Sequence, residues 1–205
     1  MATTRIRIGP ADDGRAMSLA DYLDADEEPG NRYELSRGVL EVTEIPADDH
    51  GQIVDNLHRA IERYRDHHPD LIRRIAHGSD VQLIIPETVS ERHPDLALVF
   101  QDARRDDRGR RRPDLVVEVV SPGTRARDRD YIAKREDYLA FGVREYWIVD
   151  PKECRVVVLV RAETTAGANW QERTFVDDEA IVGELLPGFE GTVRDCWEHV
   201  ETGEA

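Results

Sequence analysis

Long apolar runs and closely spaced cysteines are both missing from this chain. No run approaches the roughly 20 apolar residues that a membrane span requires, and residues 1–14 lack the apolar segment of a secretion signal. The two cysteines, Cys154 and Cys196, are far apart and have no metal-ligand spacing. We therefore expect a cytoplasmic protein with reduced cysteines and no membrane partner.

Several catalytic and cofactor motifs are also lacking. The histidines show no HExxH or HxH pattern, which argues against zinc, and no glycine-rich loop suits a phosphate group. Ser121 precedes Pro122 in a turn and lacks the strand–turn–helix setting of a serine nucleophile. We expect no organic cofactor.

Lysine is scarce, because the chain has two lysines against 26 arginines and a net charge of -15. Such a negative surface argues against nonspecific binding of nucleic acid over the whole molecule. A local basic segment is present at residues 104–112, RRDDRGRRR, with six arginines and two aspartates. It is either a solvated loop or a source of positive charge beside the strand that follows it.

The 205 residues suit one domain with a sizeable core. We place this domain at residues 18–200, between tails at 1–17 and 201–205. Apolar spacing and turn residues predict an α/β (α+β) fold with one mixed sheet flanked by helices. The expected helices cover 18–23, 50–67, the segment between Gly123 and Gly142, and 193–199. The expected strands cover 32–44 (a hairpin), 71–86, 93–100, 113–120, 144–149, 154–160 and 170–176.

The most informative stretch runs from Pro113 to Asp150 and predicts a buried strand, a turn, a helix and a second buried strand. A helix between two strands of one sheet favours a parallel pair with a right-handed crossover. Glu118 lies in the middle of the first strand, among leucine and valine residues. A carboxylate in that position costs several kcal/mol unless something pairs with it.

Two aspartates are candidate partners for Glu118 at a shared metal ion. Asp114 lies four residues away on the same strand, a separation of about 13 Å that is too long for one ion. Asp95, in the short strand HPDLALVF, is the better candidate if that strand pairs with the Glu118 strand. Two carboxylates from neighbouring strands can converge on one Mg²⁺. The alternative, that Asp95 only caps its strand, stays open.

Lys134 lies on the helix that follows Glu118. At about 100° per residue it shares a face with Tyr138 and Phe141, which should contact the sheet, whereas Asp137 should point away. A lysine on an inward face needs an acid partner, and Glu118 can supply it. Such an ammonium can neutralise charge on a phosphate in its transition state. A purely structural pair between helix and sheet is the other reading.

The segments PDLVVEVVSPGT and GVREYWIVDP, together with RYELSRGVLEV and HPDLALV, resemble the Uma2 family of putative restriction endonucleases, within the PD-(D/E)XK nuclease superfamily. The resemblance extends from about residue 19 to 197. It implies a restriction-endonuclease-like core with a mixed central sheet. It also implies that Asp95, Glu118 and the backbone carbonyl of Val119 bind the metal.

The same resemblance implies a catalytic lysine two residues after Glu118, but Val120 occupies that position. Lys134 matches the lysine that replaces it on a helix in the Uma2 family. The remaining matches, to which we assign supporting roles, are Glu34, His50, Asp114 and Asp128.

Together these features predict a DNA endonuclease that depends on Mg²⁺, with Mn²⁺ as a substitute. Asp95, Glu118 and Lys134 would be its catalytic residues. A single small domain would need to form a homodimer to cut both strands. The alternatives are a weak or inactive nucleic-acid-binding module of the same fold and an enzyme acting on RNA or a small nucleotide.

Overall fold

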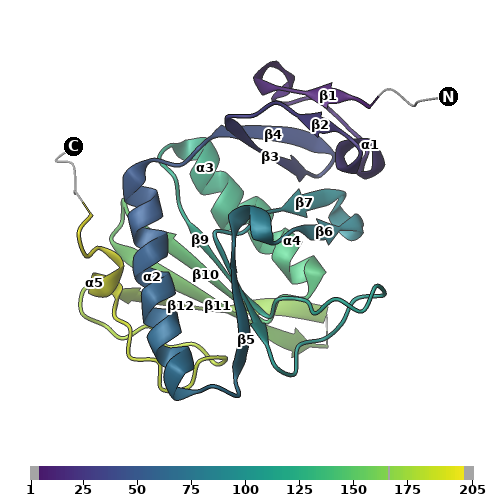
Figure 1. The fold of residues 1–205 in the computed structure, drawn as a ribbon. Coiled ribbons are helices and arrows are strands. Elements are labelled where there is room, and N and C mark those ends of the chain that lie inside the picture. Colours follow the sequence, from purple (N-terminus) through teal and green to yellow (C-terminus); the bar gives the residue numbers. More distant parts are fainter. Residues whose placement is uncertain (1–4, 166, 201–205) are drawn as a thin grey trace.

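The computed structural model describes residues 5–165 and 167–200 and shows a mixed α+β fold built on a central sheet (Figure 1). The six strands of this sheet are, in spatial order, β12 (Gly167–Val176), β11 (Arg155–Thr164), β10 (Glu145–Asp150), β9 (Leu115–Val119), β8 (Leu96–Phe100) and β5 (Ile72–His77). Only β10 and β9 are parallel, and the other neighbouring pairs are antiparallel, so the sheet is mixed, as predicted.

A four-stranded antiparallel sheet packs beside the central one (Figure 1). The hairpin predicted at 32–44 forms two of its strands, and the turn lies at Arg37 and Gly38, which both have positive φ. The strands are, in order, β4 (Val39–Glu44), β3 (Asn31–Ser36), β7 (Ser90–Arg92) and β6 (Leu83–Ile85). We did not predict β7, because its residues Ser-Glu-Arg are polar although all three are buried.

The helix α2 (Asp48–His67) covers one face of the central sheet (Figure 1). Its apolar residues recur every three or four positions, so Ile53, Leu57 and Ile61 form one stripe that packs in a cluster with Leu98 and Val117. The short helix α5 (Val193–Cys196) joins the same cluster and ends before the predicted boundary at residue 199.

The other face of the sheet is covered by the crossover between β9 and β10, which form a parallel pair as predicted. The crossover begins with α3 (Thr124–Asp128), widens into a single π-helical turn (Arg129–Ala133) and continues as α4 (Lys134–Phe141). Gly142 ends it in the left-handed conformation, which glycine adopts without steric cost.

The helix α4 lies between the two sheets (Figure 1). Tyr138 and Phe141 pack in one cluster with Val116 of β9 and Leu83 of β6. The prediction that Asp137 points away from the core is wrong. Its side chain is fully buried because the four-stranded sheet covers that side of the helix.

The fold begins earlier than the predicted boundary at residue 18. Ile8 is fully buried, and β1 (Arg7–Ile8) pairs with β2 (Asp26–Glu27), so residues 7–17 belong to the folded part and not to a tail. Ser18 caps α1 (Leu19–Leu23) by accepting the backbone N–H of Asp21. The predicted tail at 201–205 and residues 1–4 lie outside the described residues.

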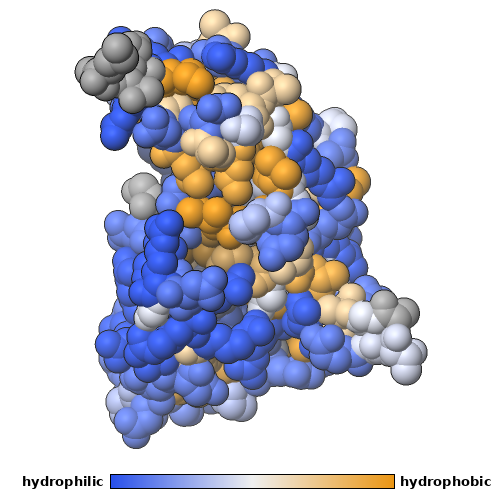
Figure 2. All heavy atoms as spheres, turned by 90° about the vertical axis from the view of Figure 1, so that its right-hand side faces the viewer, coloured by the Kyte–Doolittle hydropathy of each residue, from blue (hydrophilic) through white to orange (hydrophobic). Residues whose placement is uncertain are grey.

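Apolar residues gather on the upper part of the face in Figure 2, at the level of α1 and the four-stranded sheet in Figure 1. The exposed hydrophobic residues of these elements and their turns include Leu23, Val39 and Val89. Hydrophilic residues cover the lower part of that face (Figure 2). None of the described helices is both long and apolar enough to cross a membrane.

Candidate active site

The pairing of β8 with β9 brings two carboxylates together. These strands are antiparallel, with Leu96 opposite Val117 and Ala97 opposite Val116. Continuing this register by one residue places Asp95 opposite Glu118, and directly opposed residues have Cβ atoms about 5 Å apart. The backbone N–H of Val119 donates to Asp95 Oδ2 at 2.9 Å, which fixes the aspartate beside the second strand. The prediction that these strands are neighbours is confirmed.

Lys134 meets Glu118 from the crossover helix. Lys134 Nζ lies 2.8 Å from Glu118 Oε1, and the Tyr138 hydroxyl donates to the same oxygen. Both side chains come from one helical face, as their spacing predicts. Lys134 and Glu118 are almost completely buried, at 4% and 2% exposed. No hydrogen bond or ion pair of Glu118 Oε2 occurs within the described residues, and Glu118 lines a cavity.

Two further acids surround the Lys134 ammonium. Nζ lies 3.6 Å from Asp130 Oδ1 and 3.7 Å from Glu34 Oε1. Glu34 comes from β3, so the four-stranded sheet contributes to the site. Asp130 lies in the π-helical turn that precedes Lys134, and such turns are frequent at functional sites.

Arg92 holds Glu34 in place. Its guanidinium is completely buried and donates to Glu34 Oε2 at 3.0 Å, to Glu41 Oε2 at 2.8 Å and to Asp137 Oδ2 at 2.9 Å. The backbone N–H of His93 donates to the other oxygen of Glu34. Arg92 therefore connects β7, β3, β4 and α4 around one carboxylate of the site.

Two basic side chains approach Asp95 from the other side. His50 Nε2, in the first turn of α2, and Arg32 Nη1, on β3, each lie 3.2 Å from Asp95 Oδ1. His50 lies near the start of a helix, as predicted, and its imidazole also lies beside Asp95.

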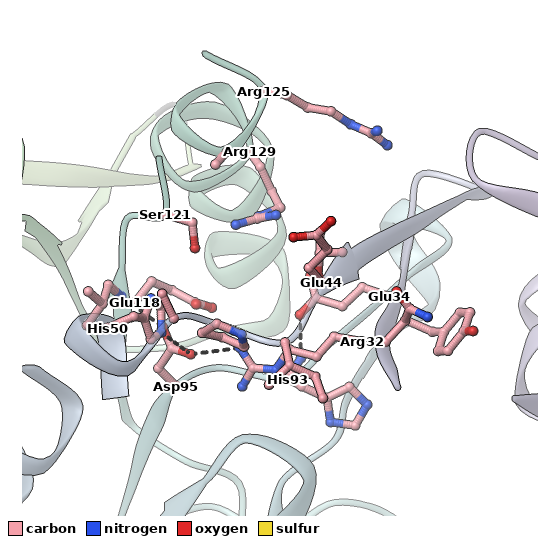
Figure 3. Close-up of a pocket in the computed structure, with 18 of the residues that line it drawn as sticks. Arg32, Glu34, Glu44, His50, His93, Asp95, Glu118, Ser121, Arg125 and Arg129 are labelled. Atoms are coloured by element: carbon pink, nitrogen blue, oxygen red, sulfur yellow. Dashed lines mark hydrogen bonds and ion pairs between the residues drawn. The ribbon is translucent and has the colours of Figure 1, made fainter. Parts of the chain in front are cut away.

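These groups line a cavity of about 630 Å³ between the two sheets and the start of α2 (Figure 3). Arg129 reaches into it from the crossover, and Arg125 lies at its outer rim, where two contacts of 2.6 and 2.7 Å pair it with Asp13. The cavity therefore combines buried carboxylates with arginines near its opening, an arrangement suited to a metal ion and a phosphate group.

Burial and neighbouring charges shift the pKa values of Glu118 and Asp95 in opposite directions. Burial raises the pKa of Glu118, and the nearby Asp95, Asp130 and Glu34 add to this rise, against the opposing effect of Lys134. Burial also acts to raise the pKa of Asp95, but His50, Lys134 and Arg32 outweigh it and hold that pKa well below its usual range. Asp95 is thus firmly ionised, whereas ionising Glu118 costs free energy that a bound cation can offset.

Lys134 is an ammonium in this setting. Burial alone would lower its pKa, but the carboxylates of Glu118, Glu34 and Asp130 outweigh that effect and raise it.

Three sequence predictions do not fit the cavity. Asp114 lies at the opposite end of β9, near Arg144 at 3.7 Å, and Asp128 is exposed on α3. Neither lines the cavity. The basic segment 104–112 is not beside Glu118 either, because it precedes β9 and Glu118 lies near the far end of that strand. The arginines at the cavity are Arg32, Arg125 and Arg129 instead.

The donor set suits a hard cation. Within the described residues, no three His, Cys, Asp or Glu side chains are grouped so that they could hold a metal without other ligands. Asp95 and Glu118 are two carboxylates, and Mg²⁺ commonly binds through one or two of these, with water and substrate phosphate completing its shell. The unpartnered Oε2 of Glu118 is the oxygen that such an ion would take. These residues therefore fit Mg²⁺ or Mn²⁺ as a group.

Comparisons with known proteins identify the family and the fold. A model of the Uma2 family, described as "Putative restriction endonuclease", matches residues 19–194. A crystal structure of a putative nuclease belonging to DUF820 from Anabaena variabilis ATCC 29413 superposes with a TM-score of 0.63 and 16% identity. The alignment covers 89% of this chain and 98% of that one, and at this identity it shows the fold. No curated protein matches the sequence.

Proposed function

Because the chain belongs to the Uma2 family of putative restriction endonucleases, we propose that it is a Mg²⁺-dependent DNA endonuclease of the PD-(D/E)XK type. The observation that carries this proposal is the cross-strand placement of Asp95 and Glu118 with Lys134 Nζ 2.8 Å from Glu118, all lining one cavity. Two carboxylates and a cation that line one open cavity are parts that metal-assisted phosphodiester hydrolysis uses.

In this proposal Asp95 and Glu118 hold the metal, and the backbone carbonyl of Val119 is a third ligand from the chain. Bound Mg²⁺ supplies Lewis acidity and lowers the pKa of water. Lys134 lies within 4 Å of three carboxylates, so it acts as a fixed cation that offsets the negative charge that develops on the phosphate. Tyr138 keeps the Glu118 side chain in one orientation.

Arg129 and Arg32 are the cavity arginines nearest to the carboxylates, and in this proposal they bind the phosphate oxygens of the substrate. Arginine presents a planar fork that matches phosphate geometry. Because one compact site cuts one strand, we further propose that the protein acts as a homodimer in the cytoplasm. Light scattering on purified protein tests the dimer.

The test of the enzyme is cleavage of supercoiled, linear and single-stranded DNA, with RNA as a fourth substrate, in Mg²⁺, Mn²⁺ or EDTA. We expect EDTA to abolish cleavage and Glu118→Gln and Lys134→Met to lower its rate by about 10²-fold or more. The matched control is Lys152→Met, since Lys152 is the second lysine of the chain and is exposed. Cleavage that persists in both site variants would refute the assigned site.

A second function, nucleic-acid binding without cleavage, is favoured by one observation. The acids of the cavity already have basic partners, namely Arg32 and His50 at Asp95 and Lys134 at Glu118. A metal ion would have to compete with these cations. Calorimetry with Mg²⁺ separates the two functions. DNA binding by the wild type with neither cleavage nor metal binding would support the binding module.

A further inference from the structure

A second cavity, of about 250 Å³, lies away from the candidate active site. It is lined by Val99 and four arginines, Arg73, Arg74, Arg105 and Arg111. Such a concentration is unexpected in a chain of net charge -15. Neighbouring guanidinium groups repel one another, and although Arg73, Arg74 and Arg105 are exposed and their repulsion is screened by solvent, the four together make the groove locally positive.

A β-bulge directs two of these arginines into the groove. On the edge strand β5, Ile72 pairs with Phe100 and Arg74 with Val99, so Arg73 is an extra residue in the strand. In a regular strand, consecutive side chains point to opposite faces. The bulge breaks this alternation, and both Arg73 and Arg74 line the same groove.

The loop between β8 and β9 supplies the other two arginines. Arg105 and Arg111 form an antiparallel bridge across its base. Asp106 stiffens the loop tip by accepting the backbone N–H groups of Arg108 and Arg110. The basic segment 104–112 is therefore an ordered turn that shares the groove with residues of β5, and not only a solvated loop.

None of the four groove arginines forms an ion pair with an acid in the part of the chain that the structure describes. Arg74, Arg105 and Arg111 donate to backbone carbonyls of Asp80, Gly109 and Ala103. These bonds orient the guanidinium groups and leave their charges uncompensated. The acid of the loop, Asp106, pairs with Arg110 at 2.8 Å.

The groove and the active-site cavity lie on the same face of the central sheet. Along β8, side chains alternate, so Asp95, Ala97 and Val99 share one face, and Ala97 packs in the cluster of α4. Val99 is four residues from Asp95, a distance of about 13 Å. That distance spans about four base-pair steps of 3.4 Å in a DNA duplex.

We propose that Arg73, Arg74, Arg105 and Arg111 form an anion-binding groove for backbone phosphates of DNA, outside the reacting site. The identification of the ligand as DNA rests on the proposed function, whereas the preference for an anion rests on the four arginines, none of which has an acid partner within the described residues. The groove anchors the nucleic acid about 13 Å from Asp95 and adds affinity without contributing to the chemistry.

The test is the salt dependence of DNA binding in EDTA, where no cleavage occurs. A labelled 30-base-pair duplex is titrated with wild type and with the double variant Arg73→Gln/Arg105→Gln, by fluorescence anisotropy between 50 and 200 mM NaCl. The matched control is Arg63→Gln/Arg173→Gln, which removes two exposed arginines, on α2 and on the opposite edge strand β12. Thermal unfolding verifies that every variant is folded.

Each phosphate contact contributes about 0.9 to the slope of log affinity against log salt. We expect the groove variant to lose about 1.8 from that slope, with the control unchanged. Over a fourfold change in salt, the wild type then loses about twelvefold more affinity than the groove variant. An unchanged slope in the groove variant, or no binding of duplex by the wild type at 50 mM NaCl, overturns the proposal.

Two further arms identify the anion. Inorganic phosphate, followed by calorimetry, and vesicles containing phosphatidylserine, followed by sedimentation, are titrated with the same proteins. If the groove variant binds phosphate or the vesicles more weakly than the wild type does, but binds DNA equally well, the assignment of the ligand as DNA is overturned. A groove-dependent salt slope in a wild type that never cleaves DNA supports the groove and refutes the proposed nuclease. Cleavage of DNA by the wild type, together with an unchanged salt slope in the groove variant, supports the proposed nuclease and refutes the groove.

Discussion

Replacing Arg92 by methionine should destabilise the protein strongly. The side chain is completely buried and donates to Ser36 as well as to the carboxylates of Glu34, Glu41 and Asp137. Methionine keeps an unbranched apolar stem but lacks the guanidinium group, so the variant would leave the acids without their partner. Asp137 is fully buried, whereas Glu34 and Glu41 retain some exposure, so most of the cost comes from Asp137.

Removing one partner of a buried ion pair costs about 3–5 kcal/mol. For a chain of this size, 1 kcal/mol lowers the melting temperature by about 2–4 °C, so we expect a decrease on the order of 10 °C. Urea unfolding and differential scanning calorimetry measure these changes. Arg173→Met is the control, because Arg173 is exposed and forms no ion pair within the described residues.

A second variant separates charge from packing. Asp137→Asn added to Arg92→Met removes the most deeply buried uncompensated carboxylate, so it should restore part of the lost stability. A loss below about 1 kcal/mol in Arg92→Met, or no recovery in the double variant, would show that Arg92 does not link the four-stranded sheet to α4 in the way described.

Two other predictions concern glycine and cysteine. A Cβ at Gly183 would lie 1.9 Å from Glu145 Oε1, so Gly183→Ala should lower the free energy of unfolding by about 1–3 kcal/mol. Gly51, inside α2, has open space around it, and Gly51→Ala should raise that free energy by about 0.5–1 kcal/mol; equal effects in urea unfolding would contradict this contrast. Cys154 is exposed, and burial raises the pKa of Cys196 to about 12, so Ellman's reagent should titrate one thiol in the native protein and two in urea. Two fast native thiols would show that Cys196 is accessible.

The crossover unit could be predicted from its residues because several local signals agree. A run of valines, a helix ending at Gly142 and a second apolar strand specify a parallel pair, which the structure has. Helical spacing also placed Lys134 with Tyr138, and both contact Glu118. These are short-range relations, so the sequence carries them directly.

The burial of Asp137 could not be predicted in that way. Helical spacing separates an inner from an outer face only when one side of the helix meets solvent. Here α4 lies between two sheets, and its second side contacts β7, a strand whose three residues are all polar. The contact depends on Arg92, whose burial is satisfied by acids that are distant in sequence. No local sequence pattern indicates which distant acids pair with Arg92.

The position of Asp130 beside Lys134 could have been predicted from helical spacing. It lies four residues before Lys134, and side chains four apart share a helical face. Asp128, taken from the resemblance, lies six residues before Lys134 and is exposed. The spacing rule applied backward from Lys134 therefore indicates the acid that lies beside its ammonium, even though Asp130 is part of a π-helical turn.

The position of the lysine follows from how β9 is packed. Glu118 and Val120 share one face of β9, and Val120 is buried in the cluster with Tyr138 and Phe141. A lysine at position 120 would enter that apolar cluster, whereas Lys134 approaches Glu118 from the helix. From there it also contacts Glu34 of β3, so the second sheet takes part in positioning the cation. In this fold Lys134 and the four-stranded sheet are therefore coupled, and the orientation of Lys134 depends on the Arg92 network.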